Sequence, residues 1–332
     1  MTRTARATGA ALLAACLVIA VPAPLHAQAT QSQPGPPPPP PQPPPEGAPT
    51  TPALRRLVDG HMEPTRVATG FGSLGGIVWS RTGALIVADV RYGQLLEWTV
   101  AGGIHVWREV SGGAVGIALD RNGRLLAPER GLQRVTRIEN QTSTTILEQL
   151  DGVTLQGPRV VLPAADGSIY VGDSAGRVGR VIRIDAAGVA RVVADDVKTP
   201  SGLAMSPSGQ VLYVSDETAG EVRAYSIEAD GLLGSGRRLT VIAPWKAGVK
   251  GRAAGMAVDN SGHVLLAGPG GIWVFDANGG RLGVIATSET PAACTFGDAD
   301  HRTLYIAAET SIYRVRMKIP GAPAPAATPS PR

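Results

Sequence analysis

The sequence predicts an all-β protein, a six-bladed β-propeller whose blades are four-stranded antiparallel sheets. Of its 332 residues, 42 are glycine and 28 are proline, which disfavours helices, since glycine loses much backbone entropy there and proline lacks an amide donor. A turn followed by a short apolar strand recurs, with glycines at Gly83, Gly123, Gly167, Gly209 and Gly262. Their spacings of 40, 44, 42 and 53 residues are typical of propeller blades. A sixth copy without the glycine, at 298–306, completes the count of six blades.

Residues 1–29 have the features of an export signal. Arg3 and Arg6 precede the apolar run 10–21, and an Ala-x-Ala site ends at Ala29. A positive start, a short apolar stretch and small residues at the cleavage site describe a signal peptide that is removed. We therefore expect a periplasmic or secreted protein. In an alternative interpretation, a lipoprotein processing box ends at Cys16 and leaves a lipid anchor there.

Proline-rich sequence flanks the predicted propeller on both sides. Residues 30–63 are interpreted as a linker, because the run Pro36–Pro41 favours extended polyproline II structure. The propeller is assigned to residues 64–318. The tail 319–332 has the composition of a disordered segment.

Each repeat supplies the strands of one blade as a meander. In the fourth repeat the expected strands are 201–206, 210–215, 221–227 and 238–242, separated by glycine, aspartate and serine turns. The last repeat ends after 311–317 with only three strands. The N-terminal segment Thr65–Thr69 can supply the missing outer strand, so we expect it to close the ring and protect the sheet edges.

Charge and composition exclude several classes of function. The net charge of +4 and the aromatic content of 4% are too low for a nucleic-acid-binding surface. No segment after the signal has 18 consecutive apolar residues, so no transmembrane span is expected. Cys294 is the only cysteine after Cys16, and we expect a buried, inert thiol without a disulfide partner.

Short strings in every blade resemble those of one known family. They are Trp79–Leu85, Glu129–Arg137, Asp166–Asp173, Pro200–Pro207, Leu212–Asp216, Gly255–Asp259 and Cys294–Gly297. In this order, from about Thr65 to Gly321, they are similar to the senescence marker protein, gluconolactonase and luciferin-regenerating enzyme family. The resemblance implies a six-bladed propeller that hydrolyses sugar lactones or related esters with a divalent cation, such as calcium, in its central channel.

The cation's role in such chemistry is to polarise the carbonyl and to lower the pKa of bound water. The four positions that carry its oxygen ligands in the family are occupied here by Gly75, Arg159, Ser201 and Ala254. A hard cation takes roughly six or more oxygens including carboxylates, and the positive charge of Arg159 would repel it. We therefore expect no family-type metal and no other cofactor.

Two interpretations of the function stay open. In the first, the chain is a lactone or ester hydrolase whose site has been rebuilt at one rim of the channel. In the second, it is a non-catalytic propeller of the cell envelope that binds a small molecule or a protein. Neither interpretation identifies catalytic residues.

The candidate ligand-binding residues lie where antiparallel strands return to one rim of the channel. They are Asp89, Glu129, Asp173, Asp216, Arg159 and Ser201. Arg159 is the candidate contact for an anionic group of the ligand, since a guanidinium binds carboxylates well. The alternative for the four acids is that they accept hydrogen bonds from turn amides and pair with neighbouring arginines.

Overall fold

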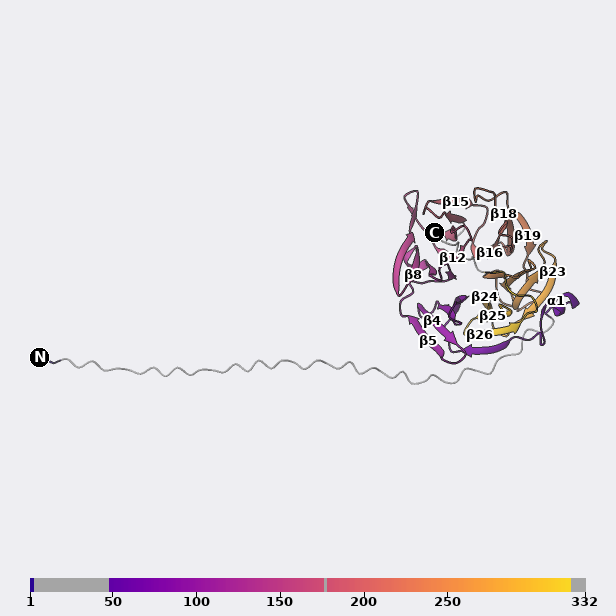
Figure 1. The fold of residues 1–332 in the computed structure, drawn as a ribbon, viewed down its shortest axis with the longest axis horizontal. Coiled ribbons are helices and arrows are strands. Elements are labelled where there is room, and N and C mark those ends of the chain that lie inside the picture. Colours follow the sequence, from indigo (N-terminus) through magenta and orange to yellow (C-terminus); the bar gives the residue numbers. More distant parts are fainter. Residues whose placement is uncertain (3–47, 176–177, 324–332) are drawn as a thin grey trace, which may run out of the picture. The chain divides into compact units, whose positions relative to one another are not determined.

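Six four-stranded antiparallel sheets are arranged in a ring in the computed structural model, which confirms the predicted six-bladed propeller (Figure 1). The structure describes residues 1–2, 48–175 and 178–323. The predicted signal peptide and Cys16 lie outside the described residues, apart from residues 1–2.

In each of the first three blades, the four strands follow one another in chain order from the innermost strand outwards. Blade one consists of β2 (Leu74–Trp79), β3 (Leu85–Asp89), β4 (Gln94–Thr99) and β5 (Gly103–Arg108). Blade two consists of β6 (Ala118–Leu119), β7 (Leu125–Glu129), β8 (Arg134–Glu139) and β9 (Thr142–Leu147), with the 3-10 helix η1 (Arg130–Leu132) after β7. The hairpin of β10 (Gln149–Leu150) and β11 (Val153–Thr154) leads to blade three, which consists of β12 (Pro158–Pro163), β13 (Ile169–Ala175), β14 (Val178–Ile184) and β15 (Ala190–Ala194).

The remaining blades repeat this order until the ring closes. Blade four consists of β16 (Pro200–Met205), β17 (Val211–Asp216), β18 (Glu221–Ser226) and β19 (Arg237–Val241). Blade five consists of β20 (Met256–Val258), β21 (Val264–Gly268), β22 (Gly271–Phe275) and β23 (Arg281–Ala286). Blade six consists of β24 (Pro291–Gly297), β25 (Thr303–Ala308) and β26 (Ser311–Arg316), completed by β1 (Thr65–Thr69).

The closure of the ring is as predicted. β1 pairs antiparallel with β26, with Thr65 opposite Arg314 and Thr69 opposite Ser311. The first strand of the chain is therefore the outer strand of the last blade. Because of this pairing, the two ends of the propeller hold each other in register.

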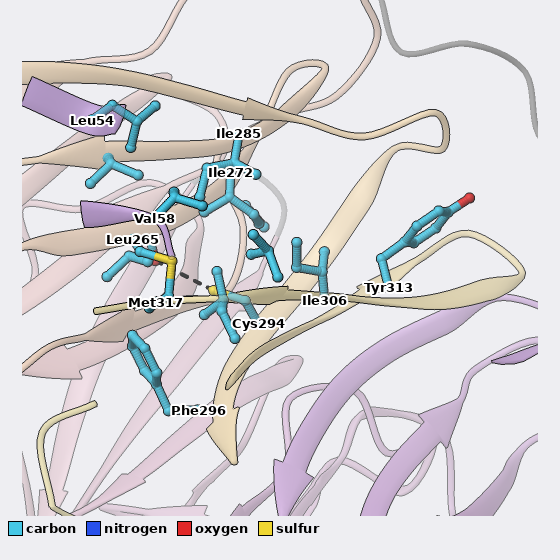
Figure 2. Packing of buried hydrophobic residues seen from close by; sticks show 14 of the residues in the cluster. Leu54, Val58, Leu265, Ile272, Ile285, Cys294, Phe296, Ile306, Tyr313 and Met317 are labelled. Carbon is cyan, nitrogen blue, oxygen red and sulfur yellow. Dashed lines mark hydrogen bonds between the residues drawn. The ribbon is translucent and has the colours of Figure 1, made fainter. Parts of the chain in front are cut away.

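A short helix precedes β1 and packs on the outside of blade five. α1 (Pro52–Leu57) begins with proline at its first position, and the Thr51 hydroxyl accepts a hydrogen bond from the Leu54 amide at 3.2 Å. Leu54 is completely buried in the apolar cluster that also holds Ile272 and Ile285 (Figure 2). α1 is also the only α-helix in the described part of the chain, and it is far too short to cross a membrane.

Both flanking segments thus contribute to the fold near the propeller. α1 falls within the range 30–63, which was expected from the sequence to be a linker. It packs on the propeller because buried Leu54 anchors this otherwise proline-rich stretch. After β26 the chain crosses one end of the channel, where the Asn260 amide donates to the Pro320 carbonyl at 2.9 Å. The Ala322 amide donates to the Val258 carbonyl at 2.8 Å. The first residues of the range 319–332 therefore follow the edge of blade five.

The innermost strands meet in direct backbone contact at four glycines. A Cβ added to Gly202 would lie 2.2 Å from the Ala254 carbonyl oxygen. The corresponding distances are 2.5 Å from Gly76 to the Val115 oxygen, 2.7 Å from Gly116 to the Arg159 oxygen and 2.9 Å from Gly255 to the Ala293 Cα. No side chain fits at such distances, so each site requires glycine. We call Gly76, Gly116, Gly202, Gly255 and the backbone they contact the neck of the channel.

Replacement of one neck glycine tests how much the ring depends on these contacts. We expect Gly202→Ala to lower the free energy of unfolding by about 3 kcal/mol, because the new methyl group meets a backbone carbonyl that cannot move without separating two blades. Gly188→Ala is the control: Gly188 has φ +88° and open space around it, so its cost is about 1 kcal/mol of backbone strain. Urea denaturation measures both, and equal losses would contradict the role of the neck.

Candidate functional site

The central channel is a cavity of about 1360 Å³ between the innermost strands. Its upper mouth is the end at which those strands begin, and its lower mouth is the end crossed by the C-terminal segment. The upper mouth is lined by Gly75, Val115, Arg159, Ser201, Glu217, Arg252, Ala254, Pro291 and Ala292. This mouth contains Arg159 and Ser201, two of the residues expected from the sequence to bind a ligand.

Three charged side chains from neighbouring blades meet at the upper mouth. Arg159 Nη2 donates to Glu217 Oε2 at 2.6 Å, and Arg252 Nη1 donates to Glu217 Oε1 at 3.4 Å. The side chains of Arg159 and Glu217 are 23% and 20% exposed, whereas that of Arg252 is 72% exposed. The cluster is thus partly shielded from water on the side of Arg159 and open on the side of Arg252.

The mouth carries more positive than negative charge. Burial lowers the pKa of the Arg159 guanidinium from its ordinary value, and the Glu217 carboxylate opposes this shift. Arg130 and Arg252 lower the pKa of Arg159 further through like-charge repulsion. Two guanidinium groups, those of Arg159 and Arg252, therefore share the single carboxylate of Glu217, and Arg130 adds a further like charge near Arg159.

Glu217 was not among the residues expected from the sequence. It directly follows Asp216, which was among them and is the last residue of β17. The two side chains take different directions, so Asp216 is turned into the blade and Glu217 lines the channel. The signal was present in the sequence as a second acid at the same strand end.

Ser201 lines the upper mouth, but its hydroxyl serves the packing of two blades. Ser201 Oγ donates to the Ala253 carbonyl at 2.8 Å and lies 3.0 Å from Ser215 Oγ. Ser215 Oγ in turn donates to the Ala254 carbonyl at 2.7 Å. These bonds join β16 to the strand that begins blade five.

The four candidate acids do not line the cavity. Asp89, Glu129 and Asp216 end the second strands of their blades, Asp173 lies two residues before the end of β13, and each of the four is at most 2% exposed. Asp216 accepts hydrogen bonds from the amides of Lys198, Thr199, Thr218 and Ala219, at 2.6 to 3.1 Å. The structure therefore brings Arg159 and Ser201 together at the mouth and places these four carboxylates inside the blades.

The other three acids have similar surroundings. Asp89 accepts from the amides of Gly72, Ser73 and Tyr92. Asp173 accepts from the amides of Gln156 and Gly157 and pairs with Arg180. Glu129 pairs with Arg134 at 2.6 Å and accepts from the Thr136 hydroxyl. Asp89 and Asp173 thus hold the loops that precede the inner strands, whereas Glu129 bonds to side chains of β8.

Gly75 and Ala254, two of the positions at which the sequence resemblance implies metal ligands, offer no side-chain oxygen and little free space. A Cβ added to Gly75 would lie 2.8 Å from Val90 Cγ2 and 3.1 Å from the Val115 carbonyl oxygen, so Val90 fills the space of a side chain there. Ala254 offers only its carbonyl, which already accepts from Ser215. Among residues 48–175 and 178–323, no three His, Cys, Asp or Glu side chains are placed to hold a metal ion.

Arg252 is brought to the mouth by the long loop between β19 and β20. This loop accounts for the largest spacing in the sequence repeat, that between Gly209 and Gly262. Trp245 packs so closely on Gly270, in the turn between β21 and β22, that a Cβ there would lie 2.3 Å from its ring. The Gly270 amide donates to the Lys250 carbonyl at 2.9 Å. The loop is therefore anchored on blade five just before Arg252.

Cys294 also lines the channel, but as a buried group. It is 5% exposed, its thiol donates to the Leu265 carbonyl at 3.6 Å, and burial raises its pKa to about 12 (Figure 2). Such a thiol is almost entirely protonated at neutral pH and is a poor nucleophile. The structure confirms the buried thiol expected from the sequence.

Comparison with known proteins identifies relatives across most of the chain. The sequence model described as SMP-30/Gluconolactonase/LRE-like region matches residues 75–310. A gluconolactonase of Zymomonas mobilis is 24% identical over 278 residues, which cover 73% of this chain and 78% of that protein. A 6-deoxy-6-sulfogluconolactonase of Pseudomonas putida is 31% identical over 139 residues, 39% of this chain and 44% of that protein.

Solved structures show the same architecture. A putative gluconolactonase superposes with a TM-score of 0.76 at 26% identity, covering 83% of this chain and 99% of that one. A gluconolactonase from Xanthomonas campestris superposes with a TM-score of 0.74 at 25% identity, covering 81% and 94%. The calcium-binding protein regucalcin of Agrobacterium tumefaciens, 16% identical with a TM-score of 0.65 over 82% and 96% of the chains, shows the fold alone.

The adjacent acids Asp216 and Glu217 should behave differently when neutralised. Asp216→Ala should lower the free energy of unfolding by about 2–3 kcal/mol, because it leaves buried amides without an acceptor. Glu217→Gln should cost about 1 kcal/mol or less, since its partners reach water at the mouth. Urea denaturation of the two variants provides the comparison, and a larger loss for Glu217→Gln would contradict the assignment of Asp216 to the blade.

Proposed function

We propose that this chain, which belongs to the SMP-30/gluconolactonase/LRE-like family, binds a small organic anion at the upper mouth of its channel without the help of a divalent cation. The cluster of Arg159, Glu217 and Arg252 is the single feature that supports this function most directly. It lies at one mouth of the central channel, and it has more positive than negative charge.

A divalent cation fits the residues of the mouth poorly. Calcium and similar ions take six or more oxygen ligands, usually including several carboxylates. Glu217 is the carboxylate at the upper mouth, and two guanidinium groups already occupy both its oxygens. Val90 fills the space beside Gly75 in which a further carboxylate would have to stand. The proposed function therefore involves no metal ion.

An anion has suitable partners at the same place. The guanidinium fork of an arginine binds a carboxylate through two parallel hydrogen bonds. Burial makes the charge of Arg159 more effective, because the Coulomb interaction strengthens as the surroundings exclude water. Glu217 holds Arg159 and Arg252 on its two oxygens and so fixes the direction of both. The incoming anion would share these guanidinium groups with Glu217.

Hydrolysis of a lactone or ester is the second candidate function. The gluconolactonases at 24–26% identity favour it, and Glu217 is the carboxylate that could take a proton from an attacking water in the channel. However, both carboxylate oxygens of Glu217 already accept hydrogen bonds from guanidinium groups, so neither is placed to accept a proton from a water molecule. The geometry therefore supports binding better than hydrolysis.

Export is part of the proposal and is supported by the sequence of residues 1–29, most of which lie outside the described residues. The positive start, the apolar run and the Ala-x-Ala site favour a mature protein in the periplasm or outside the cell. Lipidation at Cys16 remains the alternative. The mass of the mature N-terminal peptide distinguishes a chain that begins near residue 30 from one that begins with a lipidated cysteine.

Substitution of Arg159 tests the anion site. We expect Arg159→Leu to weaken the binding of butyrate and gluconate at least about tenfold, because a charge-assisted hydrogen-bond donor is lost. Arg238→Leu removes an equal charge from the exposed outer strand of blade four and should leave both affinities unchanged. Isothermal titration calorimetry of the three proteins gives the dissociation constants. Equal affinities in Arg159→Leu and the unchanged chain would refute the site.

A panel of sugar lactones separates the two candidate functions. The purified mature protein is assayed with calcium, zinc or manganese added and with a chelator as the control. We expect no turnover above the uncatalysed rate in any of these conditions, since the mouth lacks the oxygen ligands that the reaction's cation requires. Turnover that the chelator abolishes would show that other groups hold a metal and would establish the hydrolase.

A further inference from the structure

The upper mouth has two chemically different sides. The charged side chains come from blades three to five, whereas Val115, Pro291 and Ala292 line the mouth on the side of blades two and six. Val90, which follows β3 of blade one, is not itself a lining residue but lies against Gly75, which is. Val90 Cγ2 and Val115 Cγ1 lie 2.8 and 3.5 Å from the position of a Cβ on Gly75. The two valines therefore converge over this glycine and form a small apolar surface opposite the arginines.

We propose that the anion bound at this mouth is amphipathic: a carboxylate whose apolar body lies on Val90 and Val115, and not a polyhydroxylated sugar acid. This inference rests on the anion site proposed above and adds the class of ligand. Val90 is 40% exposed, so it offers apolar area that a ligand can cover. Covering such area is favourable roughly in proportion to its size.

The mouth offers few hydrogen-bond partners for sugar hydroxyls. The hydroxyl of Ser201 is bonded to Ala253 and Ser215. The nearest backbone groups are bonded to one another, as the Gly116 amide is to the Arg159 carbonyl at 2.8 Å and the Gly255 amide to the Ala292 carbonyl at 2.9 Å. A sugar acid would lose hydrogen bonds to water without replacing them, and an alkyl or aromatic acid would not.

Apolar side chains continue along the channel below the mouth. Half-buried Leu119, Leu162 and Met205 line it at the lower ends of blades two, three and four. A longer apolar body can therefore extend from the mouth into the cavity while its carboxylate stays on Arg159. The gradient from charged rim to apolar wall matches the gradient from head to tail of an amphipathic acid.

Two six-carbon carboxylates make a matched pair of probes. Hexanoate and gluconate have the same length and charge, and gluconate adds only hydroxyl groups. We expect hexanoate to bind at least about tenfold more tightly than gluconate, and affinity to rise about threefold to fourfold per methylene from butyrate to octanoate. Titration calorimetry of the mature chain, with Arg159→Leu as the control for the site, gives these ratios.

The two possible failures are distinguishable. Arg159-dependent binding in which gluconate equals or exceeds hexanoate would overturn the amphipathic ligand and leave the anion site intact. Binding of no acid in the series, or binding that Arg159→Leu does not weaken, would overturn the anion site and this inference with it.

A valine substitution tests the apolar surface itself. Val90→Thr keeps the side-chain shape and replaces one methyl group by a hydroxyl, and the exposure of Val90 lets the variant fold. We expect the preference for hexanoate over gluconate to fall about threefold or more, while Val241→Thr on the exposed outer strand of blade four leaves it unchanged. An unaltered preference in Val90→Thr would overturn the contact.

Discussion

Direct backbone contact between the innermost strands is the constraint on which the rest of this propeller depends. Gly76, Gly116, Gly202 and Gly255 each stand where a side chain would collide with the backbone of the next blade. Because Gly116 touches the Arg159 backbone, the same contact that closes two blades also fixes where the Arg159 side chain begins. The width of the channel and the placement of its charged mouth thus have a common origin.

The buried carboxylates and the partly buried Arg159 have different environments. The carboxylates of Asp89, Asp173 and Asp216 are surrounded by backbone amides, which stabilise a loop at each blade and leave no oxygen directed to the channel. Arg159 is partly buried with one carboxylate partner and two like charges nearby, so its environment is incompletely balanced. An imbalance of this kind, in a cavity, is more typical of a binding site than of a structural ion pair.

Much of the fold followed from the sequence because it depends on repetition and alternation. The glycine spacing predicted the blades, and the incomplete last repeat predicted that Thr65–Thr69 closes the ring. The site was harder to predict, since it depends on side-chain direction at strand ends. Asp216 and Glu217 are neighbours of the same chemical type, yet only Glu217 lines the channel. The helix around Leu54 was missed because its surroundings are dominated by proline.

The pairing of β1 with β26 also has a consequence for how the chain folds. A chain synthesised or exported from its N-terminus must keep β1 without its partner until the very last strand has appeared, because these are the first and last strands of the propeller. Contacts between such distant residues form late and slow the folding of β proteins. An interrupted chain would expose the edges of β1 and of an unfinished sheet, which are sites of aggregation. Only a chain that includes both β1 and β26 can bury both edges, so a truncated chain cannot form the closed ring.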